Sequence, residues 1–100
     1  MLYRGTTPTH TFKLPFSTDD IQTVIAGYFQ NGSLLLRKED ADFLREGDML
    51  KVKLTQKETL LFDCKYPFLV QLKVKTIYDD VLVSDPISSD VRDCLIEGEL

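Results

Sequence analysis

The 100-residue sequence contains no tryptophan, one histidine and two cysteines, and its five glycines are dispersed. Dispersed glycines exclude a P-loop and a dinucleotide-binding fingerprint, because both need several glycines within one short loop. The longest apolar runs are far shorter than the roughly 20 residues that a membrane-spanning helix needs. Met1 is followed by Tyr3, Arg4 and a polar stretch, which is unlike the apolar core of a signal peptide. We therefore expect the chain to be made and folded in a cytoplasm.

The charge balance also argues against nucleic-acid and membrane binding. Sixteen acidic and twelve basic residues give a net charge of −4. A general nucleic-acid binder needs a basic face to displace counterions from phosphates, and anionic membranes attract polybasic segments. We therefore expect no nucleic-acid or membrane partner. The chain is 43% hydrophobic, enough for one folded domain with a single core.

Candidate catalytic groups are few. His10 is the only histidine, so a Ser–His–Asp triad would have to use it. It alternates with Phe12 in a Thr-rich strand pattern, where histidines are usually packed or solvated. Neighbouring carboxylates occur at turns, without the loop pattern of a calcium site. These carboxylates are Asp19 and Asp20, Glu39 and Asp40, Asp79 and Asp80, and Asp85 with Asp90. We predict no enzyme activity, catalytic residue, metal site or cofactor.

Cys64 and Cys94 match no zinc or redox motif at their spacing. We predict two reduced, partly buried thiols, with a disulfide between them as the alternative.

Alternation of apolar and polar residues predicts several short strands. They cover residues 9–15, 21–30, 33–37, 49–54, 59–64, 68–76 and 78–84. Asn31-Gly32 joins two apolar runs and predicts a type I′ hairpin, because both residues tolerate positive φ. Residues 87–96 fit either an edge strand or a short helix.

Single helical turns are predicted between strands. Ser17 can cap one turn, and Thr55 with Glu58 forms a capping-box pattern. Residues 39–48 are predicted to be a loop with one helical turn, closed by Gly47.

Together these patterns predict an all-β fold, an Ig-like or jelly-roll-like β-sandwich of about seven short antiparallel strands with one or two single helical turns. We expect an extended N-terminal arm over residues 1–8, one domain over residues 9–96, and a C-terminal tail over residues 97–100.

Two Lys-x-Lys patterns are candidate partner contacts. Lys51 and Lys53 share the outward side of one predicted strand, and Lys73 and Lys75 that of another. In one sheet they would form a basic stripe that docks an acidic partner subunit. Alternatively they are a solvated face or a guarded edge. The apolar chain ends at residues 2–3 and 94–96 either join a neighbouring subunit or fold back onto their own domain.

Three segments carry a resemblance: Tyr-Arg-Gly-Thr-Thr-Pro-Thr-His-Thr-Phe at 3–12, Leu-Thr-Gln-Lys-Glu-Thr-Leu-Leu-Phe at 54–62, and Val-Gln-Leu-Lys-Val at 70–74. The chain resembles short uncharacterised proteins encoded among the virion structural genes of bacterial phages and prophages. Lys57 stands where that pattern has Glu, and Lys73 where it often has Arg. More loosely, the chain resembles the N-terminal β-sandwich domains of phage tail and baseplate proteins.

The resemblance implies a non-enzymatic assembly module in a tail or baseplate. The implied partners are other phage structural proteins or further copies of the chain. The implied location is the bacterial cytoplasm during synthesis and then the virion. Tyr3 and Arg4 precede the first predicted strand, so our hypothesis is that they contact a neighbouring subunit. The alternative function is a small-ligand- or carbohydrate-binding β-sandwich, which would need Tyr28, Tyr66 and Tyr78 on one exposed concave face.

Overall fold

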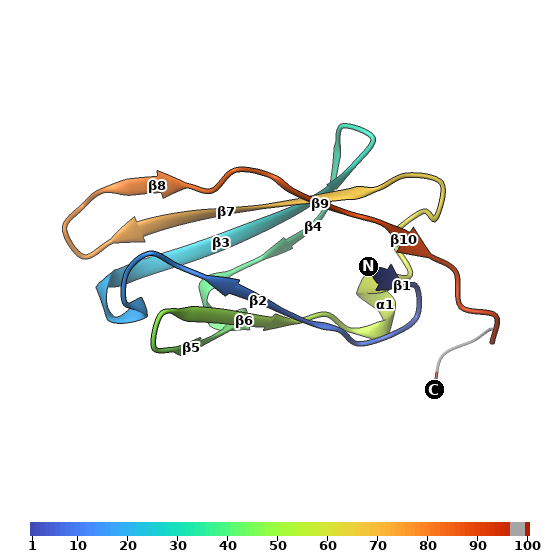
Figure 1. Cartoon of the computed structure of the whole chain (residues 1–100), viewed down its shortest axis with the longest axis horizontal. Helices are drawn as coiled ribbons and strands as arrows, with labels where there is room; N and C mark the ends of the chain where they lie inside the picture. The colour runs from blue at the N-terminus through green and yellow to red at the C-terminus, as the bar shows by residue number, and fades with distance from the viewer. Residues whose placement is uncertain (97–99) are drawn as a thin grey trace.

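The computed structural model describes residues 1–96 and residue 100, and the predicted tail falls mainly on the three residues outside this range. The described part contains ten strands, one α-helix and two short 3₁₀ turns (Figure 1). In chain order they are β1 (Leu2–Tyr3), β2 (Thr9–Lys13), a 3₁₀ turn (Thr18–Asp20), β3 (Ile21–Gln30), β4 (Ser33–Lys38), a 3₁₀ turn (Asp40–Asp42), β5 (Phe43–Glu46), β6 (Met49–Lys53), α1 (Gln56–Thr59), β7 (Phe68–Thr76), β8 (Val81–Val83), β9 (Ile87–Ser89) and β10 (Val91–Arg92).

Two antiparallel sheets form the body of the molecule. The smaller sheet has the order β2-β6-β5. The larger has the order β4-β3-β7-β8, and β9 pairs with β7 beyond the end of β8. The two sheets lie one above the other (Figure 1), and their facing residues form one core. The all-β sandwich predicted from the sequence is confirmed. A third pairing joins β1 to β10 in parallel.

Alternation along the strands decides which side chains enter the core. In β7, the buried residues Phe68, Val70, Leu72 and Val74 alternate with outward-facing ones. The aromatic rings of Tyr28, Phe62 and Phe68 meet at one end of this core, with centroids 5.4 to 6.0 Å apart. Edge-to-face contacts of this kind add to the stabilisation that burial alone provides.

The β3–β4 hairpin turns at Asn31-Gly32 as predicted. Both residues have positive φ, 49° for Asn31 and 79° for Gly32, which is the conformation that a type I′ turn requires. In the pairing of β3 with β4 the register shifts by one residue between Tyr28 and Phe29, and a β-bulge leaves Leu35 of β4 without a partner.

The capping predictions are also confirmed. Ser17 accepts a hydrogen bond from the backbone of Asp19. Thr55 and Glu58 cap α1 reciprocally: the Thr55 hydroxyl accepts from Glu58 N–H at 3.1 Å, and Glu58 Oε1 accepts from Thr55 N–H at 2.8 Å. These bonds satisfy donors that a helix start would otherwise leave unpaired.

Two local predictions are wrong. Residues 43–46, predicted as part of a loop, form β5, because Phe43 is buried and the segment pairs with β6. Residues 59–64, predicted as a strand, form the end of α1 and a loop. Phe62 still enters the core from this loop, whereas Leu60 is exposed.

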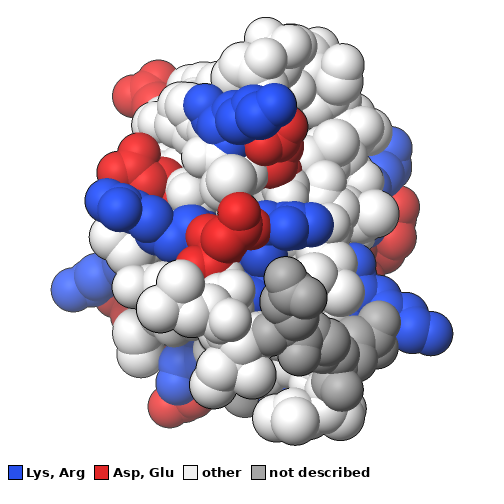
Figure 2. Space-filling view, turned by 90° about the vertical axis from the view of Figure 1, so that its right-hand side faces the viewer, with Lys and Arg blue, Asp and Glu red and all other residues white. Residues whose placement is uncertain are grey.

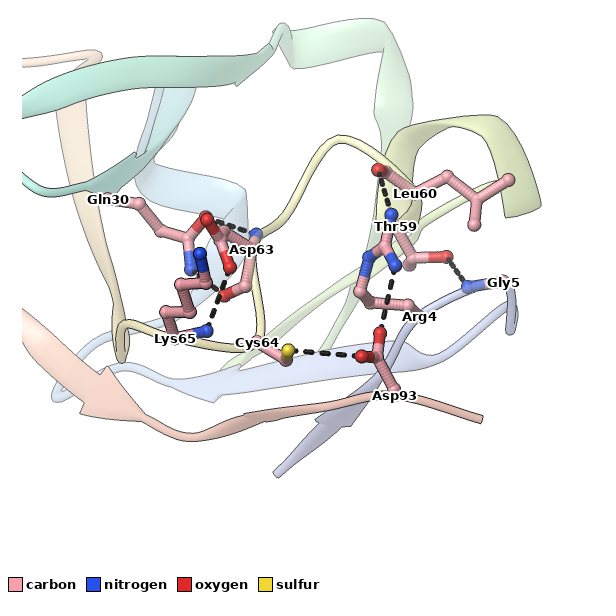
Figure 3. Close-up of polar contacts among 9 residues, drawn as sticks. All are labelled: Arg4, Gly5, Gln30, Thr59, Leu60, Asp63, Cys64, Lys65 and Asp93. Atoms are coloured by element: carbon pink, nitrogen blue, oxygen red, sulfur yellow. Dashed lines mark hydrogen bonds and ion pairs between the residues drawn. The ribbon is translucent and has the colours of Figure 1, made fainter. Parts of the chain in front are cut away.

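The loop after α1 is held by a side chain from β3 instead of by strand pairing. The Gln30 amide donates to the carbonyl of Asp63 at 2.7 Å, and its oxygen accepts from Asp63 N–H at 2.7 Å (Figure 3). The same amide donates to the carbonyl of Tyr66 at 2.8 Å. One buried glutamine therefore supplies partners that a neighbouring strand would otherwise have supplied.

The N-terminal segment is not a separate arm. Leu2 is only 1% exposed and belongs to the core, and its N–H donates to the carbonyl of Asp90 at 2.9 Å. Gly5 N–H donates to the hydroxyl of buried Thr59. The ambiguous segment 87–96 contains β9 and β10, and no helix occurs among its residues. The apolar start of the chain therefore folds back onto its own domain.

Candidate functional site

The four predicted lysines do not form one stripe. Lys51 and Lys53 lie on β6 of the smaller sheet, and Lys73 and Lys75 lie on β7 of the larger sheet. Within each strand the alternating neighbours enter the shared core, so the two pairs point away from opposite sides of the sandwich. Lys51 pairs with Glu46 at 2.9 Å and Lys75 with Asp79 at 3.2 Å. A common basic docking stripe is therefore wrong.

Arg4 is committed to its own domain. Its guanidinium donates to Asp93 Oδ1 at 2.8 Å and to the carbonyl of Leu60 at 3.1 Å (Figure 3). Tyr3 is half-exposed beside it, in the two-residue strand β1. Arg4 thus ties the N-terminal strand to the segment after β10 within the same domain.

Cys64 joins the same cluster and is a weak nucleophile. Its thiol donates to Asp93 Oδ2 at 3.0 Å. This hydrogen bond, with smaller contributions from burial and from the charges of Asp93 and Asp63, raises the pKa of Cys64. The hydrogen bonds from Arg4 and Cys64 lower the pKa of Asp93. A reactive cysteine needs the opposite shift, towards thiolate. Cys64 and Cys94 are both free and exposed, so the expected partial burial is wrong.

His10 has a packing role. Its Nδ1 lies 2.6 Å from the hydroxyl of Tyr28, and its ring stacks on Phe68 with centroids 6.0 Å apart. Burial, with the positive charge of the N-terminus, lowers the pKa of His10. Burial, with the charge of Glu58, raises the pKa of Tyr28. Both effects favour the neutral forms, and the pair serves as a hydrogen-bonded part of the core edge.

The tyrosines required for a carbohydrate-binding face do not share one. Tyr28 is fully buried. Tyr66 and Tyr78 are exposed but lie just before and just after β7, which has nine residues. A strand of that length separates its ends by about 30 Å.

The face at the β1 and β10 end of the molecule carries mixed charges. Figure 2 shows positive and negative side chains next to one another there, with wide neutral areas between them. This face offers no broad field of one sign, which a strongly electrostatic contact would use.

The unusual feature of the described chain is the β8 edge. All three of its residues are apolar and exposed: Val81 by 56%, Leu82 by 45% and Val83 by 57%. β8 pairs with β7 on one side only and forms the border of the larger sheet (Figure 1). Edge strands are normally protected by charge, proline or covering loops, so a bare apolar edge marks a place where another strand can pair.

The hydrogen-bond register shows which backbone groups of β8 are free for pairing. Thr76 N–H donates to Asp80 C=O, and Ser84 N–H donates to Leu72 C=O. Hydrogen-bonded and non-hydrogen-bonded pairs alternate in antiparallel sheets, so Leu82 bonds towards β7. Val81 and Val83 therefore direct their N–H and C=O groups away from β7, towards the open edge.

An apolar groove of about 300 Å³ lies on the inner side of this edge. Leu72, Val74 and Leu82 of the larger sheet form one wall, and Leu14 and Phe16, which follow β2, form the other. The larger sheet extends past the smaller one here, so its inner face is only partly covered. An added strand would pair with β8 and place alternate side chains into this groove.

Among residues 1–96 and 100, no helix is long and apolar enough to span a membrane, and no group of His, Cys, Asp or Glu side chains is arranged to hold a metal ion. No family model, curated protein or solved structure matches the chain.

Sequence reasoning identified the strand at β8 but not its exposure. The available signal was the uninterrupted run Val81 to Val83, which does not alternate with polar residues as a half-buried strand does. Only the tertiary structure shows that these residues remain uncovered, because the larger sheet is wider than the smaller sheet that packs against it.

Proposed function

We propose that the protein is a non-enzymatic assembly module that acts through protein–protein contacts. The observation that carries this proposal is the exposed apolar edge of β8 with the groove beside it. An edge with free backbone groups and unburied Val and Leu side chains gains both hydrogen bonds and apolar burial when another strand pairs with it.

The resemblance to phage and prophage structural proteins supports the same function and suggests its setting, a tail or baseplate. Such particles grow by repeated contacts between folded subunits, and an edge strand provides a directional contact of that kind. The setting is part of the proposal and rests on the resemblance alone.

The chemistry of the described residues agrees with a binding role. The thiol of Cys64 is held towards its protonated form, and His10 is packed against Tyr28 and Phe68. Arg4 and Gln30 connect segments of their own domain. Cys64 and His10, the cysteine and histidine nearest to a catalytic group, thus have structural partners.

Light scattering across a concentration series tests the proposal. We expect the mass of the full chain to rise with concentration, and Val83→Lys to keep it near that of a monomer, because a lysine at an edge opposes strand pairing. Leu44→Lys is the matched control: Leu44 is 61% exposed on β5, an edge of the smaller sheet. It should assemble as the unmodified chain does. Absence of any oligomer, or an oligomer unaffected by Val83→Lys, would contradict the proposal.

A further inference from the structure

We infer that the β8 edge pairs with β4 of a second copy of the same chain, in a head-to-tail contact. The inference rests on the proposed assembly function and names its partner. β4 is the opposite edge of the same five-stranded sheet, since among the described residues it pairs with β3 alone. Every copy therefore carries both halves of the contact, one on each border of its larger sheet.

Strand direction makes this contact continuous with the existing sheet. Each neighbouring pair in the order β4-β3-β7-β8 is antiparallel, so β8 and β4 run in opposite directions. A second copy placed beside β8 with its sheet in the same orientation presents its β4 antiparallel to β8. The alternation of directions then passes from one copy to the next without interruption, and the apolar faces of the two sheets lie on the same side.

Charge distinguishes this pairing from the self-pairing of either edge. Residues 77–86 contain three aspartates and no lysine or arginine, whereas residues 33–38 contain two basic residues and no acidic one. Two β8 edges brought together would gather six aspartates, and like charges opposite each other destabilise a strand pair. The β8–β4 arrangement brings opposite charges together.

The backbone register suggests which residues meet. In a two-residue hairpin the pair that flanks the turn, Gln30 and Ser33, is hydrogen-bonded, so the next pair, Phe29 and Leu34, is not. Leu34 therefore points its N–H and C=O towards the open edge, as Val83 does. Pairing Leu34 with Val83 of the neighbouring copy places both side chains on the outer face.

The β-bulge lies between Leu34 and Arg37, so the same register sets Arg37 opposite Val81 of the neighbouring copy, on the outer face. Asp79, which pairs with outward-facing Lys75, is the diagonal neighbour of that position and lies within reach of a long side chain. Arg37 already pairs with Glu39 at 2.6 Å, but both side chains are more than half exposed. Exposed ion pairs contribute little, so this one does not prevent Arg37 from contacting a partner. Lys38 is different, because its buried ammonium is held by Glu58 at 2.7 Å inside the domain.

A head-to-tail contact also predicts the shape of the assembly. β4 lies beside residues 26–30 of β3, whereas β8 lies beside residues 73–75 of β7, which are opposite residues 23–25 of β3. Joining β8 to β4 therefore offsets each copy along the strand axis relative to the last. Repetition of one such contact gives a ring if the rotation closes and a helical filament if it does not.

Cysteine cross-linking tests the inference. In a background with Cys64→Ser and Cys94→Ser, one chain carries Val83→Cys and a second chain, of different mass, carries Leu34→Cys. Hydrogen-bonded antiparallel pairs place Cα atoms about 5.5 Å apart, within the range for a disulfide. We expect mild oxidation of the mixture to give disulfide-linked pairs of unlike chains. Each chain alone should give few pairs, and one chain carrying both substitutions should give a ladder of higher oligomers.

The control mixture replaces Leu34→Cys by Leu44→Cys, on the edge strand β5 of the smaller sheet. We expect few cross-links between this chain and Val83→Cys. Cross-links within Val83→Cys alone would overturn the inference in favour of self-paired β8 edges. Equal cross-linking in the control mixture, or none in any mixture, would also overturn it.

Charge reversal provides a second measurement. Asp79→Lys should raise the dissociation constant of the assembly roughly fivefold, because like charges then meet across the strand pair. Arg37→Glu should have a similar effect, and the double variant should recover much of the loss. Failure of the double variant to recover would count against the register.

The outcomes separate this inference from the proposed function. If the full chain assembles, and Val83→Lys prevents assembly, the proposed function stands even when the Leu34 cross-link is absent. In that case only the choice of β4 as the partner edge fails. If light scattering shows a monomer at every concentration, both fail together.

Discussion

Replacing Leu2 with alanine should destabilise the isolated domain, although Leu2 is the second residue of the chain. Its side chain is 1% exposed within the core. The N–H groups of Leu2 and Arg4 donate to the carbonyls of Asp90 and Arg92, each bond being 2.9 Å long, and hold β1 in place. Truncating a buried leucine to alanine typically costs about 2–5 kcal/mol. A terminal strand can separate locally before the rest unfolds, which limits the loss, so we expect about 2–4 kcal/mol.

Urea denaturation followed by far-UV circular dichroism measures this change directly. For a domain of this size each kcal/mol corresponds to about 4–8 °C, so the midpoint of thermal unfolding should fall by about 8–32 °C. Met1→Ala is the matched control, since Met1 is 65% exposed, and it should change stability by less than about 0.5 kcal/mol. If Leu2→Ala were as mild as Met1→Ala, the N-terminal segment would be a free arm and the reasoning would be refuted.

Two further predictions concern the turn and the ion pair. Gly32→Ala should lower the free energy of unfolding by about 1–2 kcal/mol through backbone strain alone, because φ is +79° and an added Cβ meets no atom within 4 Å. Chemical denaturation measures this loss, with Ser33→Ala as a control that should be nearly neutral. Burial of Glu58 opposes its ionisation, but hydrogen bonds from Lys38 and Thr55, with the charge of Lys38, outweigh it and lower its pKa from 4.5. This contribution to stability is therefore present above pH 4.5 and lost as pH falls through the lower folded pKa. Denaturation of Glu58→Gln across pH should show a weaker acid dependence, and an identical dependence in both proteins would contradict the assignment.

Local signals predicted the features whose causes are local. Asn31-Gly32 turns the β3–β4 hairpin because positive φ is a property of those two residues and not of their surroundings. The Thr55–Glu58 capping box depends on a spacing of three residues, which the sequence displays directly. The long alternation in β7 likewise identified both a strand and its inward face.

Features that depend on distant segments were missed. The strand β5 was missed because its residues are flanked by charged ones, and only its pairing with β6 makes this segment a strand. Conversely, Leu60 and Phe62 alternate as a strand would, yet they lie in a loop held by Gln30 of β3. A short pattern cannot show whether a partner strand is within reach.

The sequence by itself determined the fold class, the hairpin, the helical caps and most inward-facing positions, because periodicity and turn chemistry act over a few residues. The tertiary structure alone decided which surfaces remain open. It placed the Lys51 and Lys73 strands in different sheets, returned Leu2 to the core and left β8 at an uncovered edge. Each outcome depends on how strands far apart in the chain pair and on the relative widths of the two sheets. The exposed edge that carries the proposed function is therefore a product of packing between distant segments.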